Sequence, residues 1–281
     1  MEKGKVEVER IGGRTKLVRC FSKYPFKFIV PNKVGPSETD AVWIYLLTYG
    51  GGIVSGDSIA YDVSVGDGCT AVLTTQSSTK VYKSVESRCS EQILEASSLL
   101  AVIPDPVTCF STARYSQTQS FRVKAGSSLL LVDWISSGRH ETGEKWCFDH
   151  YVSTNNMFFE DGQPIFLDKM LLEKHNQCSI ASRLRGYQSI AMIVLLGPKL
   201  KHIKTKIQED VRKLMSQQLG LAASGRLPDG KPPSFLASCS VFGSESDGVV
   251  VRVASVTTEG IYSFLQHQLA PMEGLLGASP Y

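Results

Sequence analysis

The chain has 281 residues, of which 42% are apolar and 20% charged, and its formal net charge is +3. This composition is typical of a globular protein with a sizeable core, and the small, scattered charge excludes a general nucleic-acid or anionic-membrane surface. The longest apolar runs, 41–47 and 190–196, are far shorter than the ~20 residues that cross a bilayer, and the charged N-terminus does not resemble a secretory signal. We therefore expect a cytoplasmic protein without a membrane segment.

A glycine-rich segment, YGGGIVSGDS at 49–58, is the first distinctive feature along the chain. Gly51 and Gly56 have the spacing of a phosphate-binding loop, but Asp57 takes the place of its lysine and would repel phosphate. The segment therefore predicts no nucleotide site. The alternative is a turn whose glycines supply positive φ angles.

Three similar segments follow at a spacing of thirty residues: 63–72, 93–102 and 123–132. Each has a β-branched residue, a small-residue turn and an apolar run ending in valine, which predicts two strands joined by a tight turn. One such unit cannot bury its apolar face alone and must stack on its neighbours. The predicted fold is therefore mainly β, an elongated, β-helix-like stack of strands and hairpins with a ~30-residue repeat. The alternative is an incidental resemblance between hairpins.

The hydrophobic period changes in the C-terminal third. We expect a buried strand at 190–196, a helix at 203–219 that ends at Gly220, a surface loop at 224–234, and a hairpin and second helix at 240–270, before Pro271. With a β-stack core at about 16–197, the prediction is a single domain, 1–281, with two α-helices in its C-terminal third.

Patterns typical of enzymes are few. Ser77 and Lys80 form an S-x-x-K pair, but the hydroxyl-rich, β-branched surroundings disfavour the helix that a penicillin-recognising enzyme needs there. His140 and His150 flank a polar patch that could hold nickel or copper loosely, and the alternative is a solvated loop. Pro104-Asp105-Pro106 predicts a stiff corner, which either presents a surface or is a plain turn.

Four motifs in order resemble the UreD family of urease accessory proteins, called UreH in some bacteria. They are Gly51-Gly52-Ile53-Val54-Ser55-Gly56-Asp57, the run AVLTTQSSTKVY at 71–82, Pro104-Asp105-Pro106 with Phe110, and Ser137-Gly138-Arg139 with Gly143-Glu144. The resemblance covers about residues 40–175 and is closer to a plant-type, eukaryotic member than to a bacterial one. Ser55 replaces a family glycine, and the order Asp133-Trp134 departs from the family pattern, which leaves the role of that carboxylate open.

The resemblance implies a non-enzymatic maturation factor. Such a scaffold, or metallochaperone, binds apo-urease on one side and a complex of UreF with the GTPase UreG on the other, so that nickel reaches the urease active site. It implies no permanently bound cofactor, with nickel in transit and GTP handled by UreG. It also implies a mostly β body with two attached helices, and a homodimer within the complex stays an open alternative.

Three acidic residues are the metal candidates along a nickel path: Asp57, Asp105 and Glu144. Oxygen groups that bind an ion weakly at several sites suit transit better than a closed cage does. A second set of residues is expected to shape this region or a partner interface: Gly51, Gly52, Gly56, Thr74, Thr75, Gln76, Lys80, Pro106, Gly138 and Arg139.

Two other classes of protein are left open. A β-solenoid hydrolase would use the Ser/Lys pair or paired carboxylates, and a plain interaction module would use the same motifs only to form an interface. A scaffold between two large partners needs two patches, each burying on the order of 800 Å². The expected patches are the C-terminal helix with its tail Leu275-Leu276, and the flat side of the β-stack.

Overall fold

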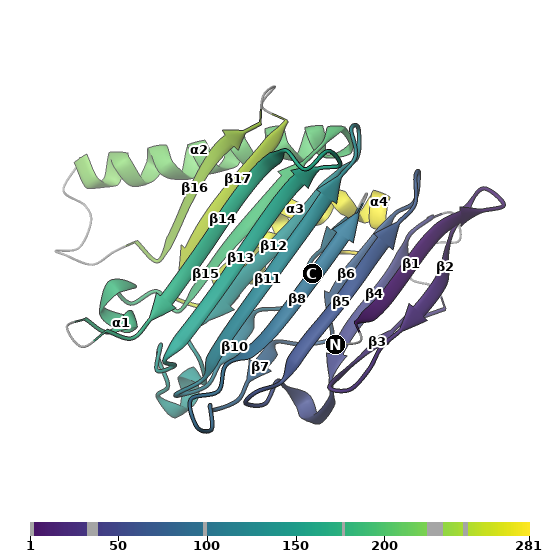
Figure 1. Ribbon diagram of the computed structural model, residues 1–281. Coiled ribbons are helices and arrows are strands. Elements are labelled where there is room, and N and C mark those ends of the chain that lie inside the picture. The colour runs from purple at the N-terminus through teal and green to yellow at the C-terminus, as the bar shows by residue number, and fades with distance from the viewer. Residues whose placement is uncertain (1–2, 33–38, 98–99, 176–177, 224–232, 244–246) are drawn as a thin grey trace.

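Two β-sheets lie face to face, and the helices of the described residues cover the outer face of only one of them (Figure 1). The computed structural model describes residues 3–32, 39–97, 100–175, 178–223, 233–243 and 247–281. Within them, sheet A has seven strands, in spatial order β14 (Pro164–Glu173), β13 (His150–Phe159), β11 (Arg114–Val123), β8 (Ser90–Ser97), β5 (Ser58–Val65), β1 (Gly4–Ile11) and β2 (Arg14–Phe21).

Sheet B has ten strands among the same residues. Eight follow the order β16 (Phe235–Phe242), β17 (Gly248–Ser255), β15 (Ser189–Leu196), β12 (Leu129–Ser136), β9 (Leu100–Val102), β6 (Ala71–Thr75), β4 (Val42–Thr48) and β3 (Phe26–Ile29). The other two form a side branch, in which β10 (Val107–Cys109) pairs with β12 and with β7 (Thr79–Val81).

The mainly β prediction is confirmed, but the predicted hairpins and the β-helix-like stack are not. In each thirty-residue unit the first strand lies in sheet A and the second in sheet B, so the turn carries the chain between sheets. The second strands pair in parallel across units, with Val72 beside Ala101 and Ala101 beside Leu130. Both sheets are open and end in antiparallel edge strands, so they do not form a solenoid.

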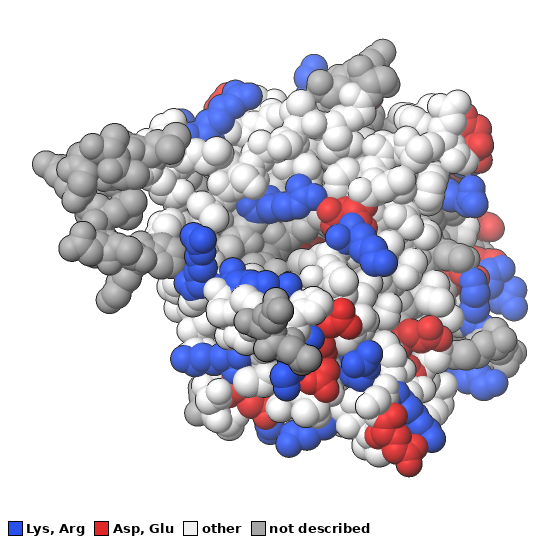
Figure 2. Space-filling view, turned by 60° about the vertical axis from the view of Figure 1, so that its left-hand side comes forward, with Lys and Arg blue, Asp and Glu red and all other residues white. Residues whose placement is uncertain are grey.

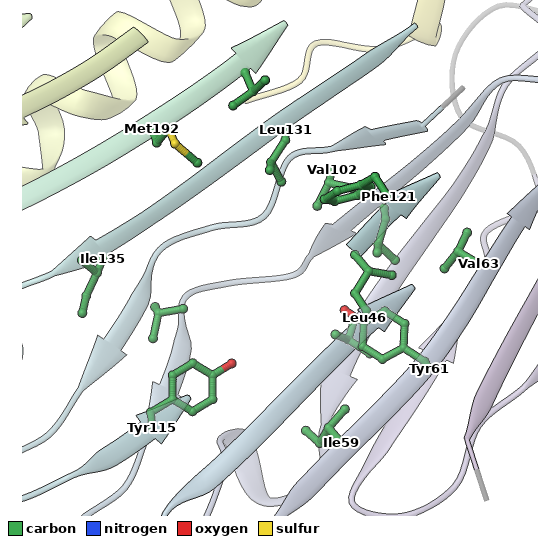
Figure 3. Packing of buried hydrophobic residues seen from close by; sticks show 14 of the residues in the cluster. Leu46, Ile59, Tyr61, Val63, Val102, Tyr115, Phe121, Leu131, Ile135 and Met192 are labelled. Carbon is green, nitrogen blue, oxygen red and sulfur yellow. The ribbon is translucent and has the colours of Figure 1, made fainter. Parts of the chain in front are cut away.

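The sequence of β12 is that of a strand in the middle of a sheet that is covered on both faces. All of its eight residues are buried. Leu131 belongs to the core between the sheets, where Figure 3 shows it with Tyr61 and Met192, whereas Val132 faces the helices on the other side. A strand with apolar side chains on both faces is typical of a sheet covered on both sides.

The two predicted helices form and pack on sheet B. Helix α2 (Lys201–Ala223) buries Ile203, Ile207 and Val211, and it continues through Gly220, since a helix tolerates an internal glycine at a cost of about 1 kcal/mol. Helix α3 (Thr258–Leu269) ends before Pro271, as predicted. The short helices are α1 (Ile180–Arg183), α4 (Glu273–Leu276), η1 (Tyr49–Gly51), η2 (His140–Thr142), η3 (Pro198–Leu200) and η4 (Ala270–Met272).

The remaining C-terminal predictions have mixed outcomes. The buried strand forms as β15, and the hairpin forms from β16 and β17, with its first strand beginning earlier than expected, at Phe235. Most of the predicted loop at 224–234 lies outside the described residues. None of the described helices is long and apolar enough to cross a membrane.

The first of the two expected patches is wrong. Helix α3 turns its apolar side chains onto sheet B, where Ile261, Leu265 and Leu269 are fully buried, and Leu276 is 1% exposed, although Leu275 is 43% exposed. The physical reason is that β15 and β17 present apolar side chains on this face and need cover. The flat side of sheet A has no helix over it in the described part of the chain (Figure 1).

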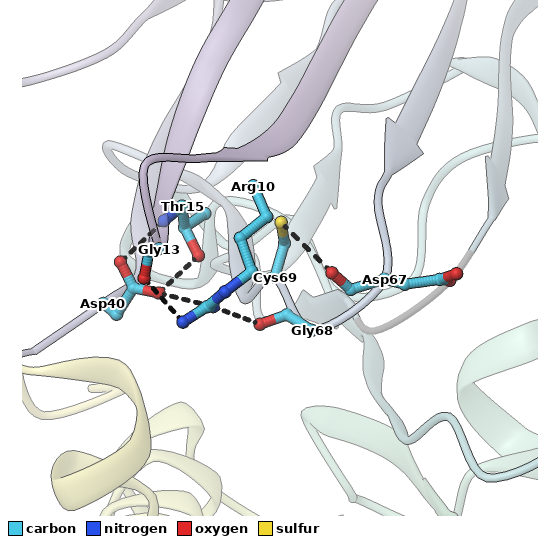
Figure 4. A network of polar contacts seen from close by, with 7 residues as sticks. All are labelled: Arg10, Gly13, Thr15, Asp40, Asp67, Gly68 and Cys69. Atoms are coloured by element: carbon cyan, nitrogen blue, oxygen red, sulfur yellow. Dashed lines mark hydrogen bonds and ion pairs between the residues drawn. The ribbon is translucent and has the colours of Figure 1, made fainter.

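A polar network fixes the tip of the β1–β2 hairpin to the turn between β5 and β6 (Figure 4). The Arg10 guanidinium donates to Asp40 Oδ2 at 3.1 Å and to the Gly68 carbonyl at 2.9 Å. Asp40 also accepts from the Thr15 N–H at 2.7 Å and from its hydroxyl at 2.8 Å. This holds the N-terminal hairpin in register at the edge of sheet A.

Candidate functional site

The four motif segments lie side by side at one end of the sandwich, although they are far apart in the chain. We call this the motif end, formed by 49–57, 79–82, 104–110 and 137–146; its strands β7 and β10 lie toward the lower side of Figure 1. Ile53 donates its N–H to the Lys80 carbonyl at 2.8 Å, and Thr79 donates to the Pro106 carbonyl at 3.0 Å. Backbone bonds thus join the first three segments in sequence.

Close backbone approach explains the glycines of these motifs. Gly52 is extended, but a Cβ there would lie 2.6 Å from both the Lys80 carbonyl oxygen and a Tyr82 ring carbon. Gly138 has a φ of +120°, and its Cβ would lie 3.3 Å from the Glu144 carbonyl oxygen. The predicted turn role also holds for Gly51 and Gly56, with φ of +76° and +83°.

Asp57 closes the turn in which it lies. Its Oδ2 accepts from the Val54 N–H at 2.9 Å, and its own N–H donates to the Val54 carbonyl at 3.0 Å. An aspartate that bonds to nearby backbone is a common turn device, and a lysine side chain could not accept the bond from the Val54 N–H. The carboxylate at the lysine position of a phosphate loop therefore has a structural function here.

Glu144 and Arg139 form a two-pronged ion pair on the fourth segment. Arg139 donates from Nη2 and Nε to the carboxylate at 2.5 and 3.2 Å, and the Ser111 N–H donates to the same group at 3.3 Å. The hydrogen bond from Arg139 is the main cause that holds the pKa of the Glu144 carboxyl below its usual value. The guanidinium lies 4.4 Å from the centre of the Phe110 ring, so it also joins this segment to the third.

Asp105 is held at the Pro104–Pro106 corner by groups from two distant parts of the chain. Its N–H donates to the Thr75 hydroxyl at 2.9 Å, and its Oδ1 accepts from the Tyr262 hydroxyl of α3 at 2.7 Å. Pro106 is buried, as a structural corner requires. The corner is therefore fixed on the inside by β6 and on the outside by α3.

The hydroxyl-rich run divides between the interior and the surface. Thr74 is buried and donates to the Ile103 carbonyl at 2.8 Å, whereas Gln76 and Lys80 are exposed. Ser77 precedes strand β7, so the S-x-x-K pair does not lie on a helix. This removes the geometry that a serine–lysine nucleophile would need.

A buried polar cluster lies between the sheets, centred on Asp133, whose side chain is on the inner face of β12. The carboxylate accepts from Gln117 Nε2 at 2.7 Å, from the Ser153 hydroxyl at 2.5 Å and from Asn155 Nδ2 at 2.7 Å. Gln119 adds a bond to Asn155 at 2.9 Å. We call these five residues the buried polar cluster. Burial raises the pKa of the Asp133 carboxyl, and the bonds from Ser153, Asn155 and Gln117 oppose that rise.

Asp133 stands between an internal cavity and an open groove. The cavity, of about 40 Å³, has eight Thr, Asp and Gln residues in its wall: Thr74, Thr75, Thr79, Gln92, Asp105, Gln117, Gln119 and Asp133. The groove, of about 740 Å³, is lined mainly by apolar side chains of β15, β16 and β17, with three methionines, Met170, Met192 and Met215. Figure 2 looks toward this side of the molecule, where a hollow lies among charged side chains of both signs.

The three acidic candidates do not converge on one point. Asp105 lines the cavity, whereas Asp57 and Glu144 bond to the loops in which they lie, outside the cavity wall. His150 pairs with Glu173 at 3.2 Å, and a ring nitrogen of His140 is buried without a partner. Over the described residues, no cluster of three or more His, Cys, Asp or Glu side chains has the geometry of a metal site.

Sequence reasoning missed the buried polar cluster, although one signal was available. Asp133 interrupts the apolar run LLLVDWIS, and it shares the parity of Leu131 and Ile135, which face the other sheet. Alternating polar residues on β11 and β13 place Gln117 and Asn155 on inward positions as well. A carboxylate at an inward position of a buried strand requires polar partners across the core.

Comparison with known proteins gives the family. A family profile described as "UreD urease accessory protein" matches residues 2–281. Urease accessory protein D of Arabidopsis thaliana is 57% identical over the full length of both chains, and that of rice (japonica) is 53% identical over 99% of this chain and 94% of its own. UreD of Anaeromyxobacter is 34% identical over 99% of this chain and 88% of its own. All of these relatives are named as accessory proteins of urease. Because the family profile matches nearly the whole chain and the identities are high, the chain belongs to the UreD family of urease accessory proteins.

Proposed function

We propose that this protein is a cytoplasmic scaffold that binds apo-urease and a UreF–UreG complex and lets nickel pass between them to the urease active site. The observation that carries the proposal is the position of Asp133, a buried carboxylate shared by the internal cavity and the open groove. A chain of polar groups through a core has no structural necessity, because apolar side chains would pack there without the cost of burying a charge.

The chemistry of the cavity wall suits an ion in transit. Asp105 and Asp133 supply carboxylate oxygens, and Thr74 and Thr75 supply hydroxyls, in the wall of one small cavity. A cavity of about 40 Å³ exceeds the volume of roughly 10–15 Å³ that a single water needs. Such scattered oxygen ligands bind nickel weakly enough to release it, as conduction through several sites requires.

Other parts of the proposal follow from the family resemblance. The protein holds no permanent cofactor, GTP is bound and hydrolysed by UreG, and a homodimer within the complex stays an open alternative. The contacts of Asp57 and Glu144 with nickel also stay predictions. In the structure both carboxylates accept hydrogen bonds from other groups of the protein.

The test uses the complete complex. Tagged protein, co-expressed with apo-urease, UreF and UreG, is recovered, and the nickel content of the co-recovered urease is measured for wild type, Asp105→Asn, Asp57→Asn and Asp67→Asn. We expect Asp105→Asn to form the complex but to lower nickel transfer by about tenfold or more, which corresponds to about 1.4 kcal/mol on the transfer barrier. Asp57→Asn tests the separate prediction that Asp57 contacts nickel. Asp67→Asn is the matched control, because the Asp67 side chain is 79% exposed and lies outside the cavity wall.

Two results would contradict the proposal in different ways. Recovery of neither partner by the wild type would overturn the scaffold. Full nickel loading by Asp105→Asn, together with weakened partner binding, would favour a plain interaction module without a metal path.

A further inference from the structure

The motif end carries a group of aromatic side chains that runs from the exposed Tyr24 and Tyr49 to the buried Phe110. The rings of Tyr24 and Tyr49 lie 5.8 Å apart, and the Tyr82 hydroxyl donates to the Gly50 carbonyl at 3.3 Å. The Tyr82 ring packs edge-on against Phe110 at 5.3 Å, and Arg139 covers Phe110. We call Tyr24, Tyr49, Tyr82, Phe110 and Arg139 the aromatic row.

The outer members of the row are not needed by the core. Tyr24 is 72% exposed and Tyr49 is 50% exposed, and neither belongs to the two hydrophobic clusters of the protein. Val54 and Val85, at 45% and 63% exposed, lie on the segments that follow Tyr49 and Tyr82, and the Val85 N–H joins these segments by donating to the Ser55 hydroxyl at 2.9 Å. Single exposed apolar residues are ordinary, but a contiguous group with tyrosine and arginine has the composition of a protein–protein hot spot.

Positive charge surrounds this surface. Lys27 Nζ lies 5.6 Å from the centre of the Tyr49 ring, and Lys80 and Lys83 are exposed on the next segment. The acidic groups among them are already engaged: Asp57 accepts from the Val54 N–H, and Glu86 and Glu144 form ion pairs with arginines. The complementary surface on a partner is therefore expected to offer carboxylates around a small apolar centre.

The same segments that carry the row also form the cavity wall. Thr79 of β7 and Val107 of β10 line the cavity from the inside, while Lys80 and Tyr82 lie on the outside. A protein seated on the aromatic row therefore lies within one strand layer of the cavity.

We propose that the aromatic row is the docking surface for apo-urease, through an acidic, partly apolar patch of that enzyme. This rests on the proposed function, since it assigns one of the two proposed partners to one place on the molecule. Urease is the partner that the names of the relatives contain, and the proposed transfer requires it to lie next to the cavity. The groove on the far side of Asp133 is then available to the other partner.

The experiment measures binding of purified variants to purified apo-urease and, separately, to the UreF–UreG complex. Tyr24→Ala/Tyr49→Ala removes the aromatic anchors, and Lys80→Glu/Lys83→Glu reverses the charge without touching the core. Phe159→Ala and Lys201→Glu/Lys213→Glu are matched controls, since Phe159 is 41% exposed on β13 and both lysines are exposed on α2, which covers sheet B. Thermal midpoints equal to that of the wild type confirm that each variant is folded.

We expect each row variant to lose about tenfold or more in affinity for apo-urease, with wild-type affinity for UreF–UreG and no change in the controls. The charge-reversed variant is also expected to lose most of the salt dependence of binding. Wild-type affinity of both row variants for apo-urease would overturn the inference, as would a loss confined to UreF–UreG. Failure of the wild type to bind either partner would instead overturn the proposed function itself.

Discussion

Gly52 illustrates how one residue determines the packing of the motif end. Its backbone is extended, a conformation that any residue can adopt, so the requirement for glycine comes from space alone. The carbonyl of Lys80 and the ring of Tyr82 occupy the volume that a side chain would need. Gly52 is therefore required because two segments touch there, whereas Gly51 and Gly56 of the same motif are required by the turn.

We predict that Gly52→Ala destabilises the protein by about 1–3 kcal/mol, the usual cost of forcing an extra methyl into a packed site. The measurement is the free energy of unfolding in urea. Gly12→Ala is the control, because its Cβ would meet no atom within 4 Å and only its φ of +61° opposes the change. Equal losses for the two variants would show that contact with Lys80 and Tyr82 is unimportant.

Asp133 gives a prediction for the pH dependence of stability. Because burial raises its carboxyl pKa, the folded state binds the proton more tightly than the unfolded state does. Its contribution to stability is therefore greatest below the unfolded value, roughly 4, and declines as pH rises through the higher folded value. Asp133→Asn cannot ionise, so the stability difference between wild type and variant should fall across this window. Unfolding free energies of wild type and Asp133→Asn that stay parallel from about pH 4 upward would contradict this prediction.

At the scale of elements, the corner at Asp105 shows how sheet B and its helices are joined. Tyr262 of α3 donates to the Asp105 carboxylate, and the Tyr281 hydroxyl donates to the Pro104 carbonyl at 2.9 Å. The Trp134 indole donates to that same carbonyl at 2.8 Å, and its ring centre lies 4.8 Å from that of Tyr262. The helix, the chain end and β12 thus meet at one corner of the cavity wall.

We predict unequal losses when the two hydroxyls are removed. Tyr262→Phe keeps the ring but removes a donor to a carboxylate, so it should cost about 1–2 kcal/mol. Tyr281→Phe should cost less, about 0.5 kcal/mol, since Trp134 still satisfies the Pro104 carbonyl. The measurement is the free energy of unfolding of both variants in urea. A larger loss for Tyr281→Phe than for Tyr262→Phe would contradict this account of the corner.

At the scale of the whole molecule, two cores share one sheet. Leu131 and Val132 are adjacent on β12, yet one contributes to the core between the sheets and the other to the core under α2 and α3. Sheet B cannot lose one cover without exposing apolar side chains of the same strands. The single-domain prediction therefore implies one cooperative unit.

We predict one unfolding transition for the chain, with tryptophan fluorescence and far-UV circular dichroism giving the same midpoint. Leu131→Ala should lower the unfolding free energy by about 2–5 kcal/mol, and Val132→Ala should lower it in the same transition. Two separate transitions, each sensitive to only one of these variants, would show that the helical layer is an independent unit.

The sequence by itself determined the helices α2 and α3, the strand β15, the mainly β character and, through four motifs, the family. These features depend on side-chain period and on short segments, so neighbours in the chain contain the whole signal. The same local signal could not separate hairpins from strands in facing sheets, because alternation with a period of two is common to both.

Only the tertiary structure decided the pairing of strands, the convergence of the four motifs and the buried polar cluster. Asp133 receives its hydrogen bonds from Gln117, Ser153 and Asn155, which lie on two strands of the opposite sheet. Asp105 likewise receives the Tyr262 hydroxyl from a helix far along the chain. The sequence gives the chemical type of each side chain. Its hydrogen-bond partners depend on contacts between distant segments, and no local sequence pattern specifies those contacts.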